Sequence, residues 1–308
     1  MERASNEQLE AIKGHIKQNF SWDGKSLEEI KNAAEQIPKG TILPGASIEK
    51  VQIGDLNGEW VWGERVSREK RHVILYFHGG GLILGSCDTH RGLVADISKA
   101  SGVPVLVVEY RLAPEFKYPA ANDDCLFAYR WLLNNGLVPE NIVLGGDSVG
   151  GGLVLMTLLT LRDAGEPLPK AAFLLSSWLD LVHYDGESYM TRADLDPLVS
   201  KSSNAMCLDC YLTSGETIPA ILSPIQQNLQ GLPSLFIQVG DHEVLLSDSA
   251  RLAERAREAG ADVKLEVWEN MWHVFQNVPT ILEAQAAIKG IGQFVKERFN
   301  MVVKDQAC

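Results

Sequence analysis

Short runs of apolar residues recur along this chain, and segments with a helical period separate them. In several runs almost every position is apolar, as at residues 73–77 (VILYF) and 105–108 (VLVV). Continuous runs are typical of strands buried on both faces, so they predict a mostly parallel sheet between two layers of helices. The predicted strands are residues 50–53, 59–66, 72–77, 104–109, 141–144, 171–175, 234–239 and 264–268.

Helical patterns lie between most of these strands, at residues 88–101, 120–135, 148–164, 246–259 and 280–299. Alternation of strands and helices is typical of βαβ units. The sequence therefore predicts an α/β fold, with a mostly parallel eight-stranded sheet flanked by helices.

Two segments depart from this alternation. Residues 1–45 have helical spacing, with Leu9, Ile12 and Ile16 on one face, and contain no strand. Residues 184–220 are also strand-free, although they lie between two predicted strands. Such an insertion indicates a lid over one end of the sheet. We therefore expect N-terminal cap helices at 1–45, a cap insertion at 184–220, and a core formed by 46–183 and 221–308.

Composition narrows the classes of function. The chain has 308 residues, 45% of them apolar, and a formal net charge of −12. An acidic surface repels phosphate backbones, so we expect no nucleic acid partner. The longest apolar runs, such as 153–161, are shorter than the ~18 residues of a membrane span. A polar start without a secretion signal and an odd number of cysteines, five, predict a reduced, cytoplasmic protein without a membrane partner.

The clearest chemical signature is the segment 146–150 (GDSVG). It follows the predicted strand 141–144 and opens the predicted helix 148–164, the strand–turn–helix context of a nucleophile elbow. A sharp turn there would expose the Ser148 hydroxyl at the end of the sheet, and the helix N-terminus would favour a developing anion. A phosphate-binding Walker loop would need a Gly-Lys-Ser/Thr sequence at this turn, and residues 146–152 contain no lysine.

A second motif, His78-Gly79-Gly80-Gly81, directly follows the apolar run ending at Phe77. Consecutive glycines let a loop present backbone N–H groups with no side chains in the way. We expect Gly80, Gly81 and Val149, the residue after the nucleophile, to form an oxyanion hole. His78 is expected to order this loop.

Together, residues 77–81 (FHGGG), 109–115 (EYRLAPE) and 146–152 (GDSVGGG) resemble the bacterial hormone-sensitive-lipase-like esterases (family IV). The resemblance covers nearly the whole chain. It implies an α/β-hydrolase fold with a helical cap, and a carboxylesterase that prefers short acyl chains. Two positions depart from the family pattern: Val149 replaces the usual alanine, and Leu82 stands where an aromatic often follows the glycines. Both departures bear on substrate preference.

His273 is the predicted general base. In this fold the triad runs Ser, acid, His along the chain, and His273 follows the last predicted strand, 264–268. His183 lies at the cap edge and His242 within the predicted acid loop, so neither is placed to act as the base.

The acid should follow the strand 234–239, where Asp241 and Glu243 compete. Either carboxylate could orient His273 and stabilise its imidazolium. The resemblance favours Glu243, which takes the position that an aspartate usually holds in the family. Asp248 is expected to favour the N-terminus of the following helix. Asp196-Pro197-Leu198 resembles the family's acid motif, but no strand precedes it, so we do not expect Asp196 to supply the acid.

The remaining predictions concern the pocket and the partners. Leu82 and Trp178, with Met206, Leu208 and Tyr211 from the cap, are expected to contact substrate. The pair Cys207 and Cys210 lacks the second pair of a zinc site and the context of a redox site, so we expect no metal and no cofactor.

These features predict a carboxylesterase that cleaves small-molecule esters through an acyl-enzyme. An amidase, a lactonase or a xenobiotic esterase could use the same residues, and a catalytically dead ligand-binding receptor is the alternative from another class. A homodimer through the exposed edge strand 264–268 is a further expectation.

Overall fold

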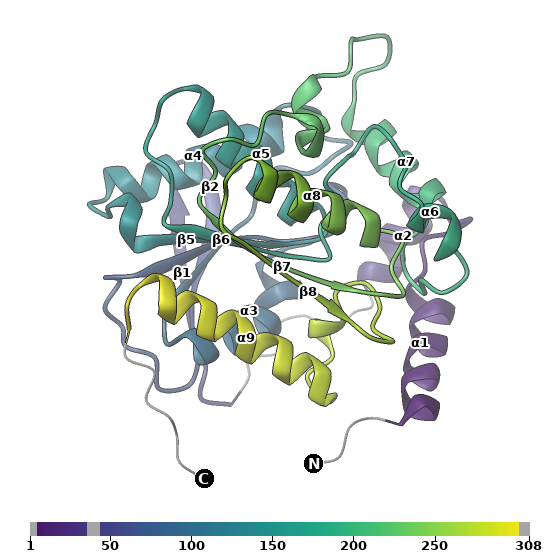
Figure 1. The fold of residues 1–308 in the computed structure, drawn as a ribbon, viewed down its shortest axis with the longest axis horizontal. Coiled ribbons are helices and arrows are strands. Elements are labelled where there is room, and N and C mark those ends of the chain that lie inside the picture. The colour runs from purple at the N-terminus through teal and green to yellow at the C-terminus, as the bar shows by residue number, and fades with distance from the viewer. Residues whose placement is uncertain (1–4, 36–43, 302–308) are drawn as a thin grey trace.

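An eight-stranded sheet forms the centre of the protein (Figure 1). This computed structural model describes residues 5–35 and 44–301. All the predicted strands are present, which confirms the α/β fold. The strand predicted to reach residue 66 ends at Trp62 instead, because Gly63 packs against the next helix and donates to Ser98 Oγ at 2.9 Å. The strands are β1 Ser47–Ile53, β2 Leu56–Trp62, β3 Val73–Phe77, β4 Val105–Val108, β5 Ile142–Asp147, β6 Ala171–Leu175, β7 Ser234–Gly240 and β8 Val263–Trp268.

The order of the strands brings the chemical motifs to one edge. It is β1-β2-β4-β3-β5-β6-β7-β8, and only the β1–β2 and β2–β4 pairs are antiparallel. The strands from β4 to β8 are parallel, so their carboxyl ends share one edge of the sheet. Ligands of open α/β sheets bind outside that edge.

Two layers of helices cover the sheet. Helices α4, α5 and α8 cover one face, and α3 and α9 cover the other (Figure 1). Every residue of β3, β4, β5 and β6 is buried, as expected for strands packed on both sides. The helices are α1 Asn6–Phe20, α2 Leu27–Glu35, α3 Cys87–Ser101, α4 Ala120–Asn134, α5 Val149–Asp163, α6 Ser188–Thr191, α7 Lys201–Tyr211, α8 Leu246–Glu258 and α9 Leu282–Arg298.

Two segments lie at the carboxyl edge of the sheet, and we call residues 5–35 and 184–220 the cap segments (Figure 1). The first contains α1 and α2, and the second contains α6 and α7. Hydroxyls of Ser200 and Ser202 both donate to Asp23 Oδ1, which joins the two segments. The expected helical residues 1–4 and 36–43 lie outside the described residues, as does Cys308.

Helix α1 begins with a capping box at Ser5 and packs its apolar face on the loop after β8. Leu9 belongs to the same buried cluster as Met271 and Trp272, the two residues before His273. The N-terminal helix therefore supports a loop that carries a predicted site residue. None of the described helices is long and apolar enough to cross a membrane.

Candidate active site

Ser148 lies on a sharp turn between β5 and α5. Its backbone has a positive φ, with φ 52° and ψ −126°, a strained state for a residue with a side chain. A Cβ on Gly150 would lie 2.1 Å from the carbonyl oxygen of Phe77, so only glycine fits that position. The chain folds tightly around Ser148, which is partly exposed between the buried residues Asp147 and Val149.

The glycine loop after β3 presents two backbone donors without partners. Gly80 has φ 116° and Gly81 has φ 61°, conformations that favour glycine. Within the described residues, neither of their N–H groups donates a hydrogen bond. Val149 begins α5, where first-turn N–H groups have no acceptor in the helix. Such groups can stabilise an oxyanion.

Asp147 joins the serine turn to the glycine loop. Its Oδ1 accepts hydrogen bonds from the Tyr76 hydroxyl at 2.8 Å and from the Gly79 N–H at 3.1 Å. Its Oδ2 lies 3.3 Å from His90 Nε2. Burial acts to raise the pKa of Asp147, but the charge and hydrogen bond of His90 and the Tyr76 bond outweigh it and lower the pKa. An ionised Asp147 therefore fixes the glycine loop.

His78 takes part in the same network as a neutral side chain. Burial, with the charge of nearby His90, lowers its pKa to about 3. The ring stacks on Tyr110, with centroids 4.2 Å apart, and the Tyr110 hydroxyl donates to the carbonyl of His78 at 2.7 Å. These contacts order the glycine loop, which is the role expected of His78.

His273 and Glu243 form a buried pair beyond the ends of β7 and β8. His273 Nδ1 lies 3.2 Å from Glu243 Oε2, and both side chains are almost fully buried. Burial alone would lower the pKa of His273, yet the hydrogen bond and charge of Glu243 raise it above its ordinary value of 6.5, with smaller contributions from Asp196 and Asp147. The pair thus favours the imidazolium form that a general base must adopt during turnover.

Ser176, which sequence reasoning missed, connects this pair to the serine turn. Its hydroxyl donates to Glu243 Oε1 at 2.7 Å and accepts from the Val274 N–H at 3.0 Å. The carbonyl of Leu175, one residue earlier, accepts from the Ser148 N–H at 2.8 Å. The end of β6 therefore holds Ser148, Glu243 and the histidine loop together. Within the described residues no hydrogen bond joins the Ser148 hydroxyl to His273, and such bonds often form only with substrate bound.

Asp241, the competing acid, does not contact His273. Its carboxylate lies 3.9 Å from His242 Nε2, and its Oδ1 has no hydrogen-bond partner among the residues that the structure describes. Asp248 is fully buried in the first turn of α8, where it accepts from the Leu179 N–H and pairs with Arg251. Burial raises its pKa to about 6. The structure therefore brings Glu243, and neither of these aspartates, to the histidine.

Contacts of the five predicted pocket residues differ. Leu82 is fully buried and follows the glycine loop, whereas Met206 is half-buried. Leu208 is buried between the cap and the core. The Trp178 indole donates to the Asp180 carbonyl, and the Tyr211 hydroxyl donates to Asn122 Oδ1. The polar groups of Trp178 and Tyr211 are thus used in structural contacts.

Two residues that were not among the predicted pocket residues, Trp22 and Cys207, contact the glycine loop. A Cβ on Gly81 would lie 2.7 Å from Cys207 Sγ and 2.8 Å from the Trp22 ring, so both side chains pack on this glycine. They come from different cap segments. The buried face of α7 repeats at Asn204, Cys207, Leu208 and Tyr211, so helical periodicity would have selected Cys207 before Met206.

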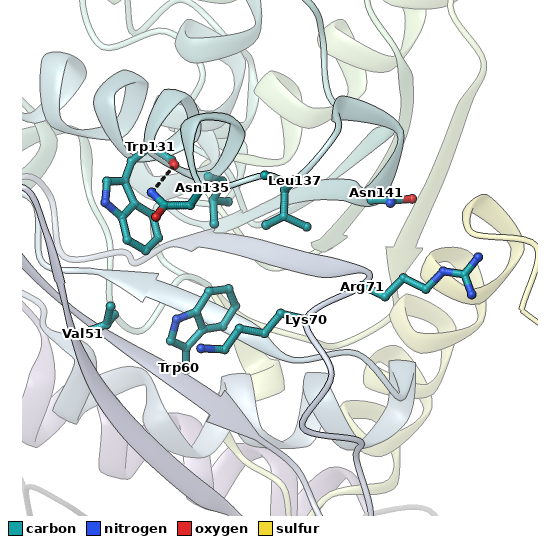
Figure 2. Close-up of a pocket in the computed structure, with 10 residues that line it drawn as sticks. Val51, Trp60, Lys70, Arg71, Trp131, Asn135, Leu137 and Asn141 are labelled. Atoms are coloured by element: carbon teal, nitrogen blue, oxygen red, sulfur yellow. Dashed lines mark hydrogen bonds between the residues drawn. The ribbon is translucent and has the colours of Figure 1, made fainter.

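A surface cavity of about 470 Å³ lies elsewhere, between the β1–β2 ribbon and the end of α4 (Figure 2). Trp60, Trp131, Lys70 and Arg71 are among its lining residues. Lys70 and Arg71 precede β3, and Asn141 precedes β5, so this cavity lies at the amino ends of the strands. None of the predicted site residues lines it.

The described residues contain no group of three His, Cys, Asp or Glu side chains that could hold a metal ion. Cys207 and Cys210 are both free thiols, and burial raises the pKa of each. The structure therefore assigns no chemistry to this pair.

Comparison with known proteins adds independent evidence. Residues 74–277 match a family model described as the alpha/beta hydrolase fold. An acetyl-hydrolase of Streptomyces hygroscopicus is 36% identical over 294 residues, spanning 94% of this chain and 96% of that protein. Other relatives are named esterases and carboxylesterases.

Solved structures agree with this. An esterase from the bacterial hormone-sensitive lipase family has a TM-score of 0.87 and 38% identity, covering 96% of this chain and 99% of the other. EstE5, in a crystal soaked with p-nitrophenyl butyrate, has a TM-score of 0.88 and 36% identity, covering 96% of this chain and 100% of the other.

Proposed function

We propose how this chain cleaves esters on the premise that it belongs to the alpha/beta hydrolase fold family, among the bacterial hormone-sensitive-lipase-like esterases. The chain is a carboxylesterase, a serine hydrolase that acts on carboxylic ester bonds. The proposal concerns the residues that perform the reaction and the esters that it prefers.

In the proposed mechanism Ser148, His273 and Glu243 form the catalytic triad. His273 accepts the proton of the Ser148 hydroxyl as Ser148 attacks the ester carbonyl, and Glu243 stabilises the resulting imidazolium. The alcohol leaves with that proton, an acyl-enzyme remains on Ser148, and His273 then activates water to release the acid. The observation that carries this proposal is the buried Glu243–His273 pair at 3.2 Å, held at the edge where the strained Ser148 turn lies.

We propose that the N–H groups of Gly80, Gly81 and Val149 hold the oxyanion of the tetrahedral intermediate. The first two lack acceptors among the described residues, and Asp147 anchors their loop through Gly79. Loss of one such donor typically raises the barrier by ~3–4 kcal/mol.

The preferred substrates are proposed to be esters of short acyl chains. The support is that Trp22 and Cys207 of the cap segments pack on Gly81, which puts cap side chains next to the proposed oxyanion hole. The relatives named acetyl-hydrolase, and the soak of EstE5 with a butyrate ester, agree with small acyl groups. Leu82, Trp178, Met206, Leu208 and Tyr211 are proposed to contribute to the remaining walls.

Hydrolysis of p-nitrophenyl esters of increasing acyl length tests these points. Wild type should cleave acetate and butyrate esters and react poorly with long chains, and Ser148→Ala should be inactive on all of them. A fluorophosphonate probe should label wild type and not the variant. Unchanged turnover by Ser148→Ala would refute the mechanism, while a preference for long chains would refute only the substrate proposal.

We further propose a cytoplasmic location. The support is that Cys87, Cys125, Cys207 and Cys210 form no disulfide within the described residues, which suits a reducing compartment. Fractionation of the native host, with marker enzymes for each compartment, tests this, and recovery outside the cytoplasm would contradict it.

A homodimer through β8 is the last part of the proposal. This strand is at the edge of the sheet, and Val267 is 49% exposed on it. Light scattering should give a dimer mass for wild type and a monomer mass for Val267→Lys, because a charge on an edge strand opposes pairing. A monomeric wild type would contradict the dimer.

A further inference from the structure

Side chains of both cap segments contact the loop that carries Glu243. We call residues 240–245 the acid loop. Arg192 Nε donates to the carbonyl of Asp241 at 2.7 Å, and Lys13 Nζ lies 3.1 Å from His242 Nδ1. The Ser188 hydroxyl donates to the carbonyl of Val244 at 2.5 Å. The residues on either side of Glu243 are therefore bound by side chains from the cap segments.

Asp196 makes the contact closest to the proposed triad. Its Oδ2 accepts a hydrogen bond from the N–H of Val244, the residue after Glu243, at 3.0 Å. Its Oδ1 accepts from the N–H groups of Leu198 and Val199, both at 3.0 Å. One oxygen therefore orders the cap turn, and the other reaches across to the acid loop. Only 5% of Asp196 is exposed, so water cannot easily replace these bonds.

The charge of Asp196 also acts on the triad. Burial raises the pKa of Asp196 to about 6, the Glu243 charge adds to this, and His273 with the Leu198 and Val199 bonds opposes it. In return, the negative charge of Asp196 helps to raise the pKa of His273, to which Glu243 and Asp147 also contribute. Asp196 is thus within electrostatic range of both members of the proposed pair.

We propose that Asp196 is a positioning residue of the ester-cleaving site, which fixes Glu243 through the backbone of Val244 and couples the seating of the cap to the geometry of the triad. This inference rests on the proposed triad. The groups that face Asp196 are Glu243, His273 and the N–H groups of Val244, Leu198 and Val199. Arg192, Lys13 and the acid-loop residues Asp241 and His242 make up the surrounding charges.

The test compares Asp196→Asn with Asp194→Asn. Asp194 is exposed on the same turn, so its variant removes the same charge without touching the acid loop. In Asp196→Asn the charge is lost, and either the bond to Val244 or the cap turn must be given up, because an amide has only one acceptor oxygen. We expect kcat on p-nitrophenyl acetate to fall by ~10- to 100-fold, with KM changed little, as for a small misplacement of a catalytic group.

The pH profile separates positioning from a general loss of fold. Removal of the Asp196 charge should move the acidic limb of kcat/KM to lower pH, because a neighbouring negative charge no longer favours protonated His273. Asp194→Asn should keep the wild-type limb and the wild-type kcat. A folded Asp196→Asn enzyme with the wild-type kcat and the wild-type acidic limb would overturn the inference. If Ser148→Ala is inactive in the same assays, that result would not contradict the proposed triad.

Asp196→Ser keeps the test decisive if Asp196→Asn is isolated unfolded. A serine hydroxyl can still accept from N–H groups two and three residues ahead, so it preserves the cap turn, but it is too short to reach Val244. The same fall in kcat and the same shift of the acidic limb are expected. Wild-type kinetics in this variant would equally overturn the inference.

Discussion

The Ser176 hydroxyl bridges the proposed acid and the histidine loop: it donates to Glu243 Oε1 at 2.7 Å while it accepts from the Val274 N–H at 3.0 Å. Ser176 itself has φ 47°, a conformation that costs free energy for a residue with a side chain. The hydrogen bonds of the Ser176 hydroxyl to two buried groups, the Glu243 carboxylate and the Val274 N–H, help to offset this cost. The geometry of the proposed triad therefore depends on Ser176, a residue just after β6 to which the proposed mechanism gives no chemical role.

Ser176→Ala should lower kcat about 10-fold or more with KM nearly unchanged, because Glu243 loses one of its two donors on Oε1 and His273 loses the anchor of its loop. The free energy of unfolding should fall by ~1–3 kcal/mol, the cost of a buried N–H left unpaired. Ser177→Ala is the matched control, since the Ser177 hydroxyl makes only a 3.5 Å contact with Leu175. Steady-state kinetics and chemical denaturation check both; equal effects in the two variants would contradict the assigned bridge.

Glu243→Gln should reduce kcat by ~10³–10⁴, because the amide cannot stabilise the imidazolium and can hold the wrong tautomer of His273. Asp241→Asn should stay within a few-fold of wild type, because Asp241 makes no contact with His273. Measurement of kcat for the two purified variants decides between the carboxylates. A larger loss of kcat in Asp241→Asn than in Glu243→Gln would make Asp241 the acid.

Activity should be lost as the pH falls through a value above 6.5. His273 must be neutral to accept the Ser148 proton, and its pKa is raised above 6.5 because Glu243 outweighs the effect of burial. The active form therefore dominates above that raised pKa, and protonation removes it below. In Glu243→Gln the remaining activity should persist to lower pH, since burial then prevails. Profiles of kcat/KM between pH 4 and 9 measure the acidic limb of wild type and of Glu243→Gln. A wild-type acidic limb well below pH 6.5 would contradict the assignment of His273 as the base.

Stability away from the site should depend on the buried ion pair between Arg91 of α3 and Glu59 of β2. Arg91 donates to both carboxylate oxygens at 2.8 Å, and both side chains are almost fully buried. Arg91→Ala should cost about 3–5 kcal/mol, because it leaves a buried carboxylate without its partner. Lys99→Ala, which breaks the exposed Lys99–Glu64 pair, should cost less than about 1 kcal/mol. Comparable urea midpoints for the two variants would show that burial does not strengthen the Arg91 pair.

Local patterns were enough to predict the sheet and its helices. Continuous apolar runs marked the buried strands β3 to β6, and the glycine motifs marked turns where a Cβ cannot fit, as at Gly150. Strand ends were less predictable. The predicted strand runs on to Val66, but β2 stops at Trp62, where Gly63 donates to Ser98 of α3, a contact that the local sequence does not encode.

Contacts between distant segments account for what the sequence could not reveal. Nothing near Ser176 signals that its hydroxyl meets Glu243, and the Asp196 segment resembles an acid motif although its carboxylate binds the backbone of Val244. Trp22 likewise reaches Gly81 only through the packing of the cap. These positions depend on tertiary structure, which residue spacing along the chain does not report.

The meeting of Trp22 and Cys207 at Gly81 has a consequence for protein engineering. The two side chains come from opposite halves of the chain, so a library that randomises only one cap segment changes only one of the two contacts with Gly81. In the proposed acyl pocket, a smaller side chain at Cys207 leaves the indole packed on Gly81, and trimming Trp22 leaves the thiol there. Selection for bulkier acyl groups should therefore succeed when both positions change together, and each single change should look neutral on its own.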